Sequence, residues 1–217
     1  MRMRTPILAG ALSLVYAVPA SAAACTFYST ATYLDIPVGG VVWGLGGALT
    51  FTDPSTTAVS GDAAMRLGNN IVVRPGIGLC SGGGESDPFF GADVGLQLSQ
   101  SATMRLNLQS GITYRSIEGG SIMNIPIGAA ASFAGSGTMG FYAGGALVWS
   151  QIEIDNFDSD SDTNPMLFGG IASRSGSMGW KLGGQLLLGD DTEFGVVAGV
   201  NFGTAASALR NFAKVLR

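Results

Sequence analysis

Apolar and polar residues alternate with a period of two through most of this chain. In SATMRLNLQSGITYRS (101–116), Met104, Leu106, Leu108 and Ile112 share one register, while the other register is polar and charged. Successive side chains of a β-strand point to opposite faces, so this pattern predicts a strand with one apolar and one polar face. An apolar repeat of helical period occurs only in the last residues, and we therefore predict an all-β protein.

The alternation divides the chain into segments separated by short turns rich in Gly, Ser and Asp. Nine strands are expected, at residues 38–52, 61–79, 89–99, 102–116, 121–134, 138–154, 166–175, 178–189 and 193–203. Longer loops are expected at residues 53–60, 80–88 and 155–165. The tail after the last segment, 204–217, has apolar residues on one helical face.

Charged side chains of these segments gather on the polar, glycine-rich face. They are Arg66, Arg74, Asp93, Arg105, Arg115, Lys181 and Glu193. The opposite face carries almost no charge, and charged residues make up only 12% of the chain, too few to cover a soluble β-sandwich. We therefore predict a closed barrel in lipid, with the apolar face outward and the charged residues lining the interior. The 34 glycines suit a narrow interior.

The N-terminus predicts export from the cytoplasm. Residues 1–22 place Arg2 and Arg4 before an apolar stretch and end in small residues, which is typical of a secretory signal peptide cut after Ala22. Without the two arginines, the 11 basic residues fall to 9 against 15 acidic ones, a net charge of −6. This charge argues against a nucleic-acid partner. In an exported protein, Cys25 and Cys80 are expected to form a disulfide.

A signal peptide, alternating segments joined by tight turns, and FGVVAGVNF near the C-terminus together resemble small bacterial outer-membrane β-barrels of the OmpA/OmpX type. The resemblance covers about residues 37–203 and implies an up-and-down antiparallel transmembrane barrel in the outer membrane. Such barrels have even strand counts, so we expect 8 strands, or 10 if residues 26–36 add one. A bond from Cys25 to Cys80 favours 8, with the N-terminal segment 23–36 outside the barrel wall. The tail at 204–217 departs from the family, whose chains usually end with the last strand.

Candidate chemistry is sparse. The chain has no histidine, which removes His-based triads and most transition-metal sites, so we expect no enzymatic activity and no cofactor. Asp158, Asp160 and Asp162 resemble part of a calcium loop, but the glycine and glutamate of such a loop are missing. A solvated acidic loop is the alternative interpretation.

These inferences predict an integral outer-membrane barrel with a structural or narrow porin-like role, its interior filled by paired charges. The expected partners are outer-membrane lipid and, for an open pore, a small solute or anion, because basic interior residues outnumber Asp93 and Glu193 by five to two. The sequence leaves the oligomeric state open. The alternatives are a surface adhesion barrel and a soluble exported β-sandwich.

Overall fold

The computed structural model describes residue 25 and residues 40–51, 55–82, 85–101, 103–134, 139–155, 159–175, 178–189 and 192–202. The predicted signal peptide (1–22), the tail (204–217) and the N-terminal segment (23–36), except Cys25, lie outside these residues. The described residues form ten strands: β1 (Val41–Thr50), β2 (Thr56–Leu67), β3 (Ile71–Gly82), β4 (Glu85–Gln100), β5 (Met104–Ile117), β6 (Gly120–Ala134), β7 (Met139–Ile154), β8 (Asp160–Ser175), β9 (Met178–Leu187) and β10 (Glu193–Phe202).

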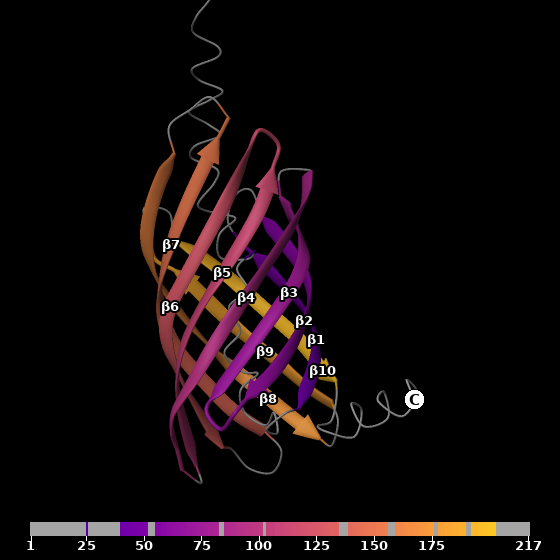
Figure 1. The fold of residues 1–217 in the computed structure, drawn as a ribbon, viewed down its shortest axis with the longest axis vertical. Coiled ribbons are helices and arrows are strands. Elements are labelled where there is room, and N and C mark those ends of the chain that lie inside the picture. The colour runs from indigo at the N-terminus through magenta and orange to yellow at the C-terminus, as the bar shows by residue number, and fades with distance from the viewer. Residues whose placement is uncertain are drawn as a thin grey trace, which may run out of the picture.

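The ten strands close into one antiparallel ring (Figure 1). Each strand pairs with its neighbours in sequence, and β1 closes the ring by pairing with β10 from Trp43↔Phe202 to Thr50↔Gly195. The prediction of an all-β, up-and-down barrel is confirmed, and the alternative of a two-sheet sandwich is wrong. In the described part of the chain, no helix is long and apolar enough to cross a membrane.

The expected count of 8 strands is wrong, because the barrel has ten. The single segment expected at 61–79 is two strands, β2 and β3, joined by a turn at residues 68–70 in which Gly68 has a φ of 63°. Glycine adopts this left-handed conformation without steric cost. The ten strands begin at Val41, so the wall is complete without residues 26–36.

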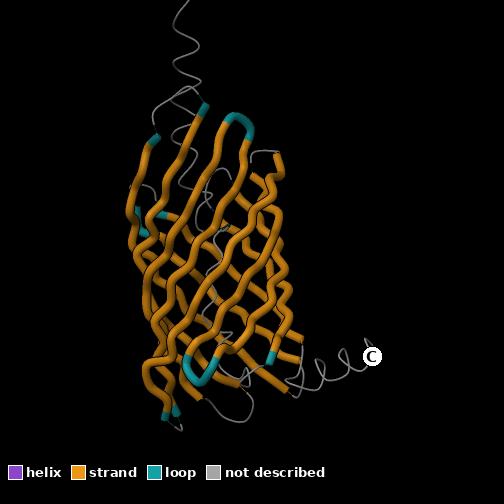
Figure 2. The backbone as a smooth tube through the Cα atoms, viewed as in Figure 1, coloured by secondary structure: helices purple, strands orange, loops and turns teal. Residues whose placement is uncertain are grey.

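The three expected loops are shorter than predicted. Strand β2 begins at Thr56, β3 continues to Gly82 with β4 starting at Glu85, and β8 begins at Asp160. The turns and loops gather at the two ends of the barrel (Figure 2). The upper end in the figures carries the β7–β8 connection, and the lower end carries the start of β1 and the end of β10.

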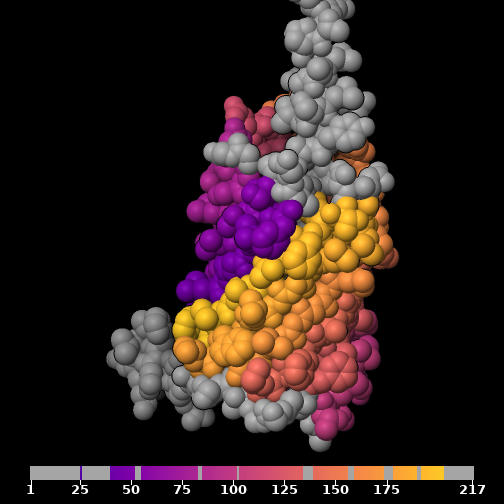
Figure 3. Space-filling view, turned by 180° about the vertical axis from the view of Figure 1, so that it is seen from behind, coloured from indigo at the N-terminus to yellow at the C-terminus, as the bar shows by residue number. Residues whose placement is uncertain are grey.

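Burial alternates along much of the wall, so its two faces differ. On β5, Leu108 is 45% exposed, whereas Asn107 is 2% exposed. The exposed face is apolar in all ten strands, with members such as Leu45, Val59, Ile77, Leu96, Ile112, Ile127, Leu147, Leu167 and Leu182. Figure 3 shows this outer wall over β8, β9 and β10 as a continuous surface. An apolar outer face with a polar inner face is the arrangement expected of a barrel in lipid.

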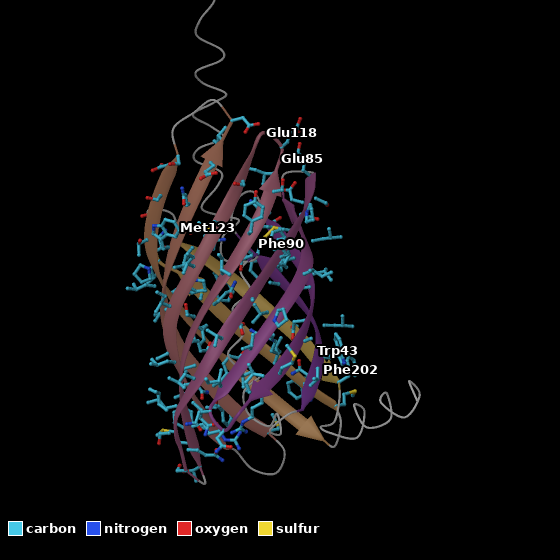
Figure 4. The ribbon with its side chains drawn as sticks, viewed as in Figure 1. Trp43, Glu85, Phe90, Glu118, Met123 and Phe202 are labelled. Carbon is cyan, nitrogen blue, oxygen red and sulfur yellow. A yellow bond between two sulfur atoms is a disulfide. The ribbon has the colours of Figure 1, made fainter. Side chains whose placement is uncertain are left out.

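Exposed aromatic side chains lie near both ends of the wall. Phe90 lies toward the upper end, whereas Trp43 and Phe202 lie at the lower end (Figure 4). The rings of Phe90 and Tyr114 are 5.2 Å apart on adjacent strands. Aromatic residues are favoured where a membrane meets water, so the two groups mark the boundaries of the apolar band.

Candidate functional site in the barrel interior

The interior face carries a buried ion pair between Arg74 on β3 and Asp93 on β4. The two residues are direct partners in the β3–β4 register, and both side chains are buried. The Arg74 guanidinium donates a hydrogen bond to the Asp93 carboxylate. Two opposite charges buried in this way satisfy each other, whereas either one alone would carry a large desolvation cost.

Lys181 on β9 interacts with this pair across the β1–β10 pairing that closes the ring. It interacts electrostatically with Asp62 on β2 and with Asp93, and it is repelled by Arg74. Strands β10 and β1 separate Lys181 from Asp62, and glycines occupy the interior face of both strands at this level. A Cβ at Gly199 on β10 would meet Lys181 Cε at 2.9 Å. A Cβ at Gly44 on β1 would meet the Asp62 carboxylate at 2.7 Å. The four charges sum to zero, and we call them the central charge cluster.

The Cys25–Cys80 disulfide lies at the interior face of the upper half of the barrel. Both cysteines are buried and pack with Ala58 and Phe89, which also face inward. The Arg115 guanidinium lies against the disulfide, with Nη1 3.0 Å from Cys80 Sγ. The predicted disulfide is confirmed. Cys25 packs against inward-facing residues of the wall. The inference from this bond to 8 strands is wrong, because the wall has ten.

Large side chains cover interior glycines on the opposite part of the wall. A Cβ at Gly170 on β8 would meet Tyr142 Oη at 2.7 Å, and one at Gly183 on β9 would meet Tyr142 Cζ at 3.1 Å. A Cβ at Gly144 would meet the ring of Phe168. Nearby, Ala146, Val148, Met166 and Leu187 form a buried apolar cluster with Phe168. Around this cluster, the interior is therefore filled by apolar side chains.

A polar column runs along the interior face of β5, and two polar residues lie on the interior face of β6. On β5 it contains Arg105, Asn107, Gln109, Thr113 and Arg115 in steps of two, interrupted by Gly111. On β6, Ser132 pairs with Arg105 in the register, and Asn124 pairs with Thr113. Between Ser132 and Asn124, the inward positions of β6 hold Ala130, Gly128 and Pro126.

The remaining predicted interior residues lie toward the ends of the barrel. The Arg66 guanidinium donates to the carbonyl of Asn69, with Nε at 3.2 Å, and so closes the β2–β3 turn. Arg105 is half-buried near the lower end, and Glu193 is fully buried at the start of β10.

Two interior acids were absent from the sequence-based set. Asp62 belongs to the central charge cluster, and Asp87 on β4 interacts electrostatically with Arg115. Asp62 stands at an even position, like Arg66 and Arg74. This shared register could have identified Asp62 as an interior residue. With these two residues, the interior side chains that the structure describes include four acidic and five basic ones. Among these side chains, the excess of basic over acidic residues is smaller than the expected five to two.

The candidate calcium residues do not form a cluster of ligands in the described residues. Asp160 and Asp162 are exposed in β8, and their carboxylates accept hydrogen bonds from the backbone N–H groups of Ser161 and Thr163 at 2.8 and 2.7 Å. Asp158 lies outside the described residues. Across the described ranges, no three Asp, Glu, Cys or His side chains come together as a potential metal site.

Comparison with solved structures identifies the class of fold. No protein-family model matches the sequence, and no curated protein sequence matches it. An outer membrane channel from Pseudomonas putida F1 is similar with a TM-score of 0.58 at 9% identity, covering 82% of this chain and 100% of the other. OmpT, the outer membrane protease of Escherichia coli, gives a TM-score of 0.47 at 10% identity, covering 81% and 100%. The N-terminal β-barrel domain of OprF from Pseudomonas aeruginosa gives 0.41 at 11% identity, covering 77% and 98%.

These structures are bacterial outer-membrane β-barrels, and the likeness to the channel shows that this chain has their fold. The predicted resemblance is therefore confirmed at the level of fold. A shared fold by itself does not specify an activity.

Proposed function

We propose that the protein is an integral outer-membrane β-barrel whose interior is closed to ions, and that it has a structural role in the membrane. The apolar outer face and the two groups of aromatic residues support insertion into lipid. A chain of this kind contributes a stable membrane-spanning wall and presents its upper loops at one surface. We expect it to have no enzymatic activity.

The central charge cluster carries this proposal. Arg74 and Asp93 are both buried, and Lys181 and Asp62 extend the network across the ring. An ion that enters the interior would have to lose its hydration shell and compete with these fixed pairs. Tyr142, which lies over Gly170 and Gly183, adds bulk on the opposite side. A permanently water-filled anion pore would instead be expected to display unpaired basic residues.

Current measurements in planar bilayers test the closed interior. We expect wild-type protein to show no steady ionic current, after insertion is verified by co-flotation with lipid vesicles and by altered mobility on unboiled gels. The double variant Arg74→Ala with Asp93→Ala removes both charges and much side-chain volume, and we expect it to conduct. The matched control, Asp160→Ala, changes an exposed acid at the upper end and should stay silent. A steady current through inserted wild-type protein would overturn the proposal.

A further inference from the structure

The Cys25–Cys80 disulfide holds an N-terminal residue inside the barrel, far from the start of the first strand. Cys25 is 2% exposed and packs with Cys80 and Ala58 on the interior face. The register runs from Cys80 through Ala58 to Ala48 on β1, so the disulfide lies at the level of Ala48. Gly40 stands eight positions before Ala48, toward the lower end. Eight positions correspond to about 26 Å along a strand.

Residues 26–39 join Cys25 to Gly40, and we call them the linker. The linker has 14 residues, and a fully extended chain of this length reaches about 50 Å from Cys25 to Gly40. Two routes connect these ends. One route runs down through the interior of the barrel, and the other passes over the upper rim and down the outer wall.

The outer route uses nearly the whole reach of the linker. It would rise from the level of Ala48 past the end of β1 and then descend outside the wall to Gly40. This path measures about 46 Å along the strand direction, before the thickness of the wall is added. The interior route needs only about 26 Å. Each described strand pairs with its neighbours around a closed ring, so the linker cannot cross the wall at an intermediate height.

The surroundings of the linker also favour the interior route. On the outer wall, its backbone N–H and C=O groups would face lipid, and the closed ring offers no free strand edge with which they could pair. Unsatisfied backbone groups are costly in hydrocarbon. Inside, a ring of ten strands is wider than a ring of eight, whose interior side chains alone can fill.

The sequence of the linker, TFYSTATYLDIPVG, suits the interior face. Six of its 14 side chains carry a hydroxyl group, which both donates and accepts hydrogen bonds. Asp35 is its one charged residue, and the described interior side chains include five basic and four acidic ones. The inward positions in the middle of β1 are Gly44, Gly46 and Ala48. Such small residues allow another backbone to approach closely.

From this geometry we infer that the interior face of β1 and β2 is a docking surface for the linker 26–39, which runs down through the barrel from the Cys25–Cys80 disulfide to the start of β1. The linker lies beside the small inward residues of β1, and the carboxylate of Asp35 offsets the excess of basic side chains. The inference goes beyond the proposed closure to ions and does not depend on it, because chain length and the closed wall carry it.

Deletions that shorten the linker distinguish the two routes. Deletion of residues 29–32 leaves ten linker residues and a reach of about 36 Å, enough for the interior route but too short for the outer one. We expect the Cys25–Cys80 bond to form as in wild type. Deletion of residues 27–36 leaves four linker residues and a reach of about 17 Å, too short for either route, so both thiols should be free. Both deletions keep every strand, because β1 begins at Val41.

Thiol labelling without reductant measures the bond, on protein whose insertion is verified by altered mobility on unboiled gels. Gels run without reductant exclude a bond between two copies of the chain. Free thiols after deletion of residues 29–32 would place the linker on the outer route and overturn the inference. An intact bond after deletion of residues 27–36 would show that Cys25 does not lie at the described height, and would overturn it equally.

A photo-crosslinker in the full-length chain gives a second test that needs no deletion. Tyr33→benzoylphenylalanine places the probe near the middle of the linker, and we expect it to attach to inward-facing residues of the wall. Phe90→benzoylphenylalanine is the matched control, because Phe90 is 57% exposed on the outer face, and this probe should attach to lipid. Attachment of the Tyr33 probe to lipid would overturn the inference. An ionic current through wild-type protein would overturn the proposed function and leave the route of the linker unchanged.

Discussion

Two adjacent glycines of β9 provide a test of how tightly the interior is filled. Gly183 faces the interior, where an added Cβ would meet the Gly169 carbonyl oxygen at 2.6 Å and the Tyr142 side chain, with Cζ at 3.1 Å. Gly184 faces outward, where the nearest atom to an added Cβ would be Phe194 Cε2 at 3.5 Å. The first distances require neighbouring atoms to move, whereas the second is an ordinary van der Waals contact.

We expect Gly183→Ala to lower the free energy of unfolding by about 1–3 kcal/mol, the usual cost of overfilling a packed interior. Gly184→Ala should be neutral or stabilising by about 0.4–1 kcal/mol, because alanine restricts the unfolded chain. Urea unfolding of the refolded barrel in lipid vesicles, followed by tryptophan fluorescence and by mobility on unboiled gels, measures both values.

A double-mutant cycle identifies the contact responsible. Tyr142→Phe removes the hydroxyl that lies over Gly183, so Gly183→Ala should cost less in that background than in wild type. Equal effects at positions 183 and 184 would show that the interior is not packed as described. Loss of stability at position 183 without coupling to Tyr142 would refute the role of that side chain.

Three further predictions concern the wall, the charges and the disulfide. Leu108→Arg should destabilise the barrel by about 2–4 kcal/mol in vesicle unfolding, because Leu108 faces lipid near the middle of β5. Ser116→Arg, at the upper end of the same strand, should cost only about 0–1 kcal/mol. Equal costs at the two positions would contradict their assigned depths in the membrane. Asp93→Leu should cost about 3–5 kcal/mol in the same assay by leaving Arg74 buried without its counterion, and adding Arg74→Met should recover most of the loss unless the pair is exposed to water. Cys80→Ser should lower the free energy of unfolding by about 2–4 kcal/mol under oxidising conditions, because the disulfide closes a loop of 55 residues. Reductant should abolish the difference from wild type. Free-thiol labelling of unreduced native protein would refute the bond.

Much of the fold could be predicted from the sequence, because alternation reports directly on which face a side chain occupies. The even residues of β4, β5, β9 and β10 were expected to point outward, and they are the exposed ones in the structure, as at Leu96, Leu108, Leu182 and Phe194. The alternation of apolar and polar residues does not depend on the length of a strand. It therefore predicted the all-β barrel and its outer face without any motif.

The number of strands could not be read from the same signal. The turn between β2 and β3 has three residues, 68–70, and an odd number preserves the register from Leu67 to Ile71. Both strands therefore keep their apolar residues at odd positions, and the alternation runs on as if the chain had not turned. Two features of the sequence still indicate a turn here. The first is the local sequence Gly-Asn-Asn, and the second is the length of the expected segment, 19 residues, which exceeds that of a strand that crosses a bilayer.

The arrangement of the interior charges depends on strand register and on closure of the ring. Arg74 and Asp93 meet because β3 and β4 pair in one particular register, which alternation alone leaves undetermined. Lys181 and Asp62 are brought together only because β10 pairs with β1. The types of residue in the interior were predictable, but their partners required the closed barrel.

Lipid quenching along β5 tests the central claim most directly, because that claim is a membrane-spanning wall with one lipid-facing register. Single cysteines at positions 104–115 would each carry a fluorophore, with the native disulfide left oxidised, in vesicles that contain brominated lipid. We predict quenching that alternates with a period of two, strong at even positions and weak at odd positions, and deepest near position 108. Uniform quenching along the strand, or stronger quenching at odd positions, would contradict the account.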